Sequence, residues 1–168
     1  MRVYFASNWN LLGGAAAGGE LGPAPITGFA VTPALREWYI DDDEEELEYA
    51  AFTEAARGSL RLIDSDALSV RRRVVISADV DDATVEFRSD LDRAVVRVST
   101  PLPMERWACV HVDSEEAEPT IAAAADAVIP ADLGDVDSQF AMDAALGHEL
   151  EWYDVSELNG LLKTSRNS

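Results

Sequence analysis

The stretch DEEELEYAAFTEAARGSLRLI, residues 43–63, contains the longest regular pattern in the chain and organises the rest of the fold around it. Small and apolar residues recur in it at spacings of three and four, which predicts a helix with one wide buried stripe. That stripe consists of Leu47, Ala50, Ala51, Ala55, Gly58 and Leu62. The acidic run 41–46 stands at the start of the helix, where the helix dipole favours negative charge. We therefore interpret the run as a solvated helix end and not as a cation site.

Shorter patterns on both sides of this helix predict a sheet. The clearest strand is RRRVVISADV, residues 71–80, and further strands are predicted at 2–6, 26–31, 84–87, 94–99, 108–112 and 150–155. Asn8, Thr32 and Ser114 are residue types that cap helices, and short helices are also predicted at 138–146 and 156–162. This order predicts an α/β or α+β fold, with a single mixed β-sheet and helices packed against it.

The length of 168 residues corresponds to one domain. We expect residues 1–162 to form a single globular domain and residues 163–168 to form a frayed C-terminal tail. The N-terminus has no signal-peptide pattern, and no apolar run approaches the ~20 residues that a membrane span needs. The single cysteine, Cys109, cannot form an intramolecular disulfide, which favours a cytoplasmic location.

The charge of the chain excludes several classes of partner. Thirty-two acidic residues against thirteen basic ones give a formal net charge of -19 at pH 7. Nucleic-acid phosphates and anionic lipid surfaces would repel such a protein, so neither nucleic acid nor membrane is expected as a partner. A lysine-poor, alanine-rich composition is typical of a GC-rich genome, and an acidic surface also suits a salt-loving host. Composition alone therefore predicts no particular chemistry.

No motif of known chemistry appears. The glycine-rich stretch 11–19 lacks the spacing of a phosphate-binding loop, and neither a cofactor nor a metal site is predicted. Cys109 is interpreted as a small buried apolar residue, and His111 and His148 as structural histidines. The basic triplet 71–73 is expected to form intramolecular ion pairs, for example with the acidic start of the long helix.

A tripeptide that occurs twice, Glu-Trp-Tyr at 37–39 and 151–153, marks the candidate binding site. Aromatic faces beside charged side chains can hold a small ligand or a peptide, although the same side chains could simply fill core and boundary positions. The candidate ligand-binding residues are Arg36, Trp38, Tyr39, Glu48, His148, Glu149, Trp152 and Tyr153.

Two functions follow from this set as expectations. The first is a non-enzymatic cytosolic binding or regulatory module for a protein partner or a small ligand. The alternative is a small enzyme of unrecognised class that uses His148 as a general base, oriented by Glu149 or Glu48. The sequence leaves the partner and the oligomeric state open.

Five stretches of the chain are distinctive when taken in order: Val31–Tyr39, Glu45–Ala51, Arg71–Val75, Val110–Asp113 and His148–Tyr153. Together they resemble a family of uncharacterised actinobacterial proteins, a domain of unknown function. The resemblance extends from Met1 to about Leu162 and implies a cytoplasmic protein of actinobacterial origin. It implies no activity and assigns no role to any residue.

Overall fold

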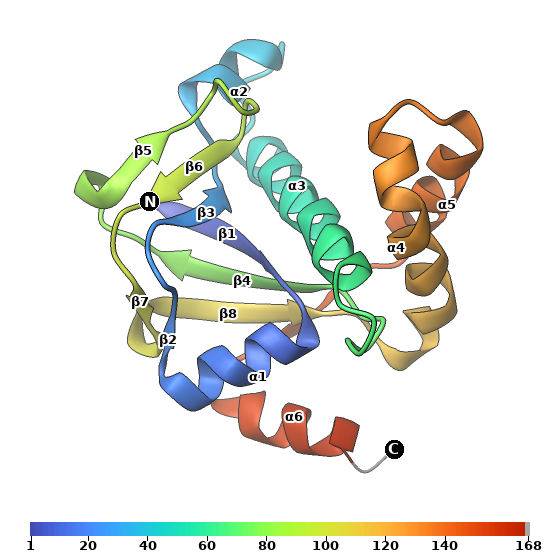
Figure 1. Ribbon diagram of the computed structural model, residues 1–168. Helices are drawn as coiled ribbons and strands as arrows, with labels where there is room; N and C mark the ends of the chain where they lie inside the picture. The colour runs from blue at the N-terminus through green and yellow to red at the C-terminus, as the bar shows by residue number, and fades with distance from the viewer. Residues whose placement is uncertain (167–168) are drawn as a thin grey trace.

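The computed structural model describes residues 1–166 and consists of one large β-sheet with helices packed on both of its faces (Figure 1). The fold is therefore α+β, as predicted. The strands are β1 (Arg2–Ser7), β2 (Glu20–Leu21), β3 (Ile26–Phe29), β4 (Val74–Asp79), β5 (Val85–Phe87), β6 (Val95–Val98), β7 (Leu102–Pro103), β8 (Trp107–Val112) and β9 (Glu151–Tyr153). The helices are α1 (Trp9–Gly18), α2 (Pro33–Trp38), α3 (Glu44–Asp64), α4 (Glu118–Asp132), α5 (Val136–Leu146) and α6 (Leu158–Arg166).

The large sheet has the strand order β5-β6-β3-β1-β4-β8-β9, and a separate small sheet pairs β2 with β7. Every strand pair of the described chain is antiparallel, so the large sheet is antiparallel and not mixed. The predicted single sheet is accompanied by the small second one. The error has a simple cause. Strands β3 and β4 both run opposite to β1 and flank it on either side, so the helical connection between them passes over β1. A strand–helix–strand order in sequence therefore does not place parallel strands side by side here.

Alternation along the central strands sorts their side chains between two cores. Val3 and Phe5 of β1, with Val74 and Ile76 of β4, face the core that α1 and α6 cover. Tyr4 and Val75 point to the other face, where they pack with Leu47, Ala51 and Ala55 of α3. The predicted faces of the long helix and of the strand at 71–80 are thus confirmed at these positions.

Local chemistry explains where the helices begin. The side chains of Asn8, Thr32 and Asp43 each accept a hydrogen bond from a backbone N–H in the first turn of α1, α2 and α3. Such caps satisfy donors that have no partner inside the helix. Helix α6 extends from Leu158 to Arg166, and its apolar side chains Leu158, Leu161 and Leu162 pack on the core. Residues 167–168 of the predicted tail lie outside the described residues.

Helix α3 lies close to the middle of the sheet and leaves one side of it open. At Gly58, a Cβ atom would lie 2.9 Å from the Cβ of Ala6 on β1, so a glycine is required for this close approach. Helices α4 and α5 form a hairpin that packs beside α3, with Ile121, Ala124 and Ala125 buried between them (Figure 1). The face of β8 and β9 that lies beyond α3 is consequently free to line a cleft.

Candidate functional site

The main cleft has a volume of about 550 Å³ and opens on the helix α3 side of the sheet. One wall is α3, the floor is the sheet, and the opposite wall is the segment that leads from α5 into β9. Clefts of about 300–1,000 Å³ are typical of small-molecule sites. The residues that line the cleft are Glu45, Glu48, Tyr49, Phe52, Thr53 and Ala56 from α3, Arg2, Tyr4, Arg73, Ser77, Cys109 and His111 from the sheet and its edge, and Leu146, His148, Glu149, Leu150 and Trp152 from the opposite wall.

The floor of the main cleft carries a small polar cluster. Antiparallel register places Ser77 of β4 opposite Cys109 of β8, and a β-bulge follows directly after Ser77. The Nε2 atom of His111 lies 3.0 Å from the Ser77 hydroxyl and 3.3 Å from the Cys109 sulfur. Burial, together with the positive charge of Arg2, lowers the pKa of His111 to about 4. The imidazole is therefore neutral at pH 7.

A thiol and an imidazole at this distance raise the question of cysteine catalysis. An activated cysteine needs a thiolate, which a protonated histidine beside it would stabilise. A histidine whose pKa is about 4 does not supply that positive charge at neutral pH. Cys109 is also only 5 % exposed, in agreement with its interpretation as a small buried residue.

Aromatic rings form the inner walls of the cleft. The ring of Phe52 meets that of Tyr4 edge-on at 5.8 Å between centroids, and it meets the His111 ring in the same way at 4.8 Å. Tyr49 and Trp152 stand at the mouth and are exposed. These rings offer apolar surface and electron-rich faces to whatever enters.

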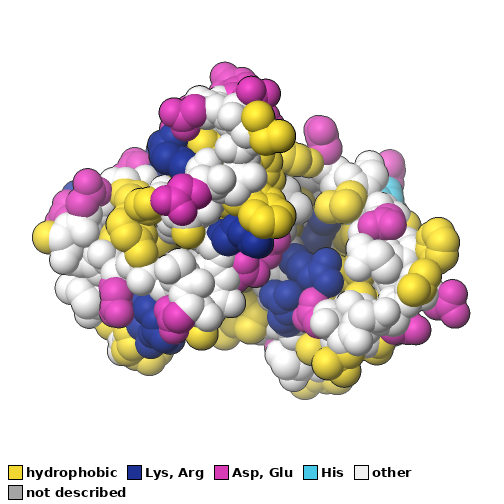
Figure 2. All heavy atoms as spheres, turned by 90° about the horizontal axis from the view of Figure 1, so that it is seen from above, with side chains coloured by type: hydrophobic (Ala, Val, Ile, Leu, Met, Phe, Trp, Pro, Cys, Tyr) yellow, Lys and Arg dark blue, Asp and Glu magenta, His cyan; other side chains and the backbone are white. Residues whose placement is uncertain are grey.

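Acidic side chains dominate the rim of the cleft. Glu45, Glu48 and Glu149 line it, and none of them forms a side-chain hydrogen bond or ion pair with any described residue. Arginine side chains are instead held close to acids of their own: Arg2 pairs with Asp79 at 2.9 Å, and Arg57 and Arg61 both pair with Asp132. In the view of Figure 2, acidic side chains are spread over the outer surface, several basic ones lie in a hollow near the middle, and others lie beside acidic side chains at the left.

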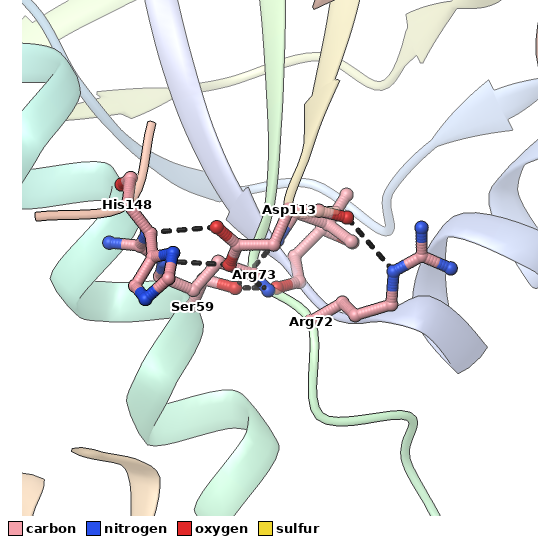
Figure 3. Close-up of polar contacts among 7 residues, drawn as sticks. Ser59, Arg72, Arg73, Asp113 and His148 are labelled. Atoms are coloured by element: carbon pink, nitrogen blue, oxygen red, sulfur yellow. Dashed lines mark hydrogen bonds and ion pairs between the residues drawn. The ribbon is translucent and has the colours of Figure 1, made fainter. Parts of the chain in front are cut away.

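A buried ion pair anchors the wall of the cleft to the sheet (Figure 3). Arg73 donates from its backbone N, Nε and Nη2 to the Asp113 carboxylate at 2.7, 2.8 and 2.9 Å. The same Nη2 donates to the backbone carbonyl of His148 at 2.8 Å, which fixes the segment entering β9. Arg72 donates to the Asp113 carbonyl, and Ser59 bridges β1 and β4 through Ser7 and Val74.

The basic triplet forms intramolecular contacts, as predicted, but its partners differ from those expected. Arg73 pairs with Asp113, while Arg71 donates to the carbonyl of Ile63. Helix α3 has 21 residues and is about 30 Å long, so its acidic start lies far from a triplet that follows its other end. Arg36 takes that role, with ion pairs to Asp42 at 2.7 Å and Glu44 at 2.6 Å.

The eight candidate residues do not form one site. The main cleft contains Glu48, His148, Glu149 and Trp152. Trp38 and Tyr39 line a second cleft of about 360 Å³, where Arg93 stacks on the Trp38 ring at 3.5 Å and burial raises the pKa of Glu54. Tyr153 packs on the opposite core and donates to Glu151 at 2.9 Å.

The two clefts share Tyr49 and Thr53 of α3. Each copy of the repeated tripeptide supplies its tryptophan to a different cleft, Trp152 to the main cleft and Trp38 to the second. The cleft residues that were not predicted from the sequence include Tyr4, Phe52, Ser77, Cys109 and His111. The sequence contains a signal for two of these residues. Cys109 and His111 are two positions apart on a predicted strand, so their side chains are expected on the same face of the sheet.

Among residues 1–166, no group of three or more His, Cys, Asp and Glu side chains is arranged to hold a metal ion. None of the described helices combines the length and the apolar character needed to cross a membrane.

The fold and the cleft together define an α+β protein with an open, aromatic-walled, acid-rimmed pocket over one end of an antiparallel sheet. The chain belongs to DUF6912, a family of unknown function whose model matches residues 1–162. No curated protein and no solved structure matches the chain. The match covers the same span as the resemblance noted from the sequence.

Proposed function

We propose that this protein is a non-enzymatic cytosolic binding module that takes a small organic ligand into the main cleft. The observation that carries the proposal is the cleft itself, at about 550 Å³ and walled by Tyr4, Phe52, Tyr49 and Trp152. Its volume, its aromatic walls and its few convergent polar groups are the features of small-molecule sites in general. A concave site of this size suits a small ligand better than the flat surface of a protein partner.

The enzymatic alternative draws less support. A general base needs an orienting partner and a substrate within hydrogen-bond reach. His148 lies in the main cleft near Glu48 and Glu149, but its ring forms no hydrogen bond with either of them or with any other described residue. Its backbone carbonyl, and not its ring, is the group held by Arg73. These features suit a wall residue better than a catalytic base.

A fragment screen followed by amide chemical shifts tests the proposal. We expect hits that shift the amides of β8, β9 and α3, with binding weakened at least tenfold by Trp152→Ala and unchanged by Trp38→Ala. The two tryptophans are similarly exposed, at 59 % and 63 %, so the control variant loses comparable surface from the other cleft. Equal effects of the two variants, or a broad library without any hit in the main cleft, would contradict the proposal.

We also infer an actinobacterial source and a cytoplasmic location. The support is compositional: Lys163 is the single lysine among thirteen basic residues, as in proteins of GC-rich genomes, and the single cysteine suits a reducing compartment. Fractionation of a native host tests the location, and recovery of the protein from the culture medium would argue against it.

A further inference from the structure

The charge inside the main cleft is unbalanced. Both of its arginines are already neutralised by carboxylates: Arg2 by Asp79, and the buried Arg73 by Asp113. The acidic residues of the rim have no such partners in the described chain; they are Glu45, Glu48 and Glu149. The cleft therefore presents net negative charge to an entering molecule, within a protein whose overall charge of -19 already attracts cations.

A second observation comes from the Tyr4 hydroxyl. Tyr4 is only 8 % exposed and lines the main cleft, yet its hydroxyl forms no hydrogen bond with any described residue. Every fully buried side-chain nitrogen or oxygen of the described residues has a hydrogen-bond partner. The unpartnered Tyr4 hydroxyl is therefore not fully buried, and the Tyr4 side chain lines the main cleft. A polar group on an otherwise buried residue, open only toward a cavity, is placed to meet a ligand.

Two of the unpartnered groups, the Glu48 carboxylate and the Tyr4 hydroxyl, are associated with the same part of the cleft through Phe52. Burial raises the pKa of Tyr4, and the negative charge of Glu48 raises it further, so that carboxylate is within electrostatic reach of the hydroxyl. Phe52 lies edge-on to the Tyr4 ring, and Glu48 and Phe52 are one helical turn apart on α3. One end of the cleft thus combines a negative charge, a hydroxyl that can accept a hydrogen bond, and aromatic surface.

We propose that the ligand of the main cleft is a small organic cation, a primary amine carried on an aromatic or compact apolar body. The inference rests on the proposed binding function and specifies its ligand class. The ammonium group donates hydrogen bonds to the Glu48 carboxylate and the Tyr4 hydroxyl, both of which accept them. The apolar body lies against Phe52 and Trp152, whose rings also attract a positive charge. Anionic ligands are disfavoured, because the carboxylates of the rim repel them.

Three probes that share a ring and differ in charge test the inference. They are 2-phenylethylamine, 2-phenylethanol and 3-phenylpropionate, titrated against the full chain and followed by amide chemical shifts. We expect the amine to bind at least about tenfold more tightly than the alcohol, and the carboxylate to bind most weakly, since a charge-assisted hydrogen bond is the main difference. The shifted amides should surround Tyr4, Glu48 and Trp152.

Matched variants separate a site from general attraction to an acidic protein. Glu48→Gln is expected to weaken amine binding about tenfold, and Tyr4→Phe to weaken it severalfold. Glu46→Gln changes the net charge by the same amount on the same helix, but Glu46 lines the second cleft, so amine binding should be unchanged. Equal losses from Glu46→Gln and Glu48→Gln would overturn the inference.

The outcomes also distinguish this inference from the function on which it rests. If the alcohol or the carboxylate binds the main cleft as tightly as the amine, the ligand class is wrong while the binding function stands. If none of the three probes binds, the inference is overturned as well, and the fragment screen alone then decides whether the cleft binds any ligand.

Discussion

Replacing Asp113 with asparagine is expected to lower the free energy of unfolding by about 3–5 kcal/mol. The Asp113 side chain is fully buried and that of Arg73 is 4 % exposed. Asparagine keeps one acceptor oxygen but turns an NH₂ group toward a guanidinium that has only donors. It also leaves the arginine charge unpaired in the interior, and this is the larger part of the cost.

Urea unfolding followed by circular dichroism measures the effect. For a domain of this size the loss corresponds to a fall of about 6–20 °C in Tm. Arg36→Gln is the control, because it breaks ion pairs with Asp42 and Glu44 that are exposed and screened by solvent, and it is expected to cost much less stability than Asp113→Asn. The two substitutions thus compare a buried and an exposed arginine pair in one protein.

The double variant Arg73→Met with Asp113→Leu provides the decisive comparison. Apolar residues of similar volume can replace a buried pair at little cost. The double variant should therefore lose less stability than the sum of the losses from Arg73→Met alone and Asp113→Leu alone. Additive losses, or an Asp113→Asn variant within about 1 kcal/mol of the parent protein, would refute the reasoning.

Two other perturbations follow from the same structure. Burial and Arg2 lower the pKa of His111 from 6.5 to about 4, so the unfolded chain binds this proton more readily than the folded one. The free energy of unfolding should therefore fall by up to about 3 kcal/mol as the pH drops from 6.5 to 4. Urea unfolding at several pH values across that range measures this, and a pH dependence that is unchanged in His111→Gln would contradict it. Gly28→Ala should destabilise by about 1–3 kcal/mol in the same assay, because the added Cβ would lie 2.6 Å from Val3 Cγ1. Gly13→Ala meets nothing within 4 Å inside α1 and should instead stabilise by about 0.5–1 kcal/mol; a loss of stability there would count against the geometry of α1.

Local chemistry allowed much of the fold to be predicted. The caps at Asn8 and Thr32, and the apolar spacing of α3, depend on residues within one or two helical turns, whereas the side chain of Ser114 forms no capping hydrogen bond. The faces of β4 follow from alternation along a single strand. The direction and order of the strands could not be predicted from such local patterns, because the helical connection that leaves β3 passes over β1 before β4 begins. That path depends on long-range packing.

The candidate site was predicted only in part for the same reason. Glu48 and Trp152 were selected, and both line the main cleft. The floor is built from Ser77 and His111, which are 34 positions apart and meet only through the register of β4 on β8. The repeated tripeptide suggested one site, yet α3 stands between its two copies. Two segments with the same short sequence therefore need not contribute to the same site.

The distribution of tryptophans gives this protein built-in optical probes. Trp9 and Trp107 are buried, while Trp38 and Trp152 are exposed and each marks a different cleft. A Trp38→Phe variant would leave Trp152 as the one emitter among the four indoles that water-soluble quenchers can reach readily, and Trp152→Phe would do the reverse. Occupancy of either cleft can then be followed by fluorescence without attaching a dye.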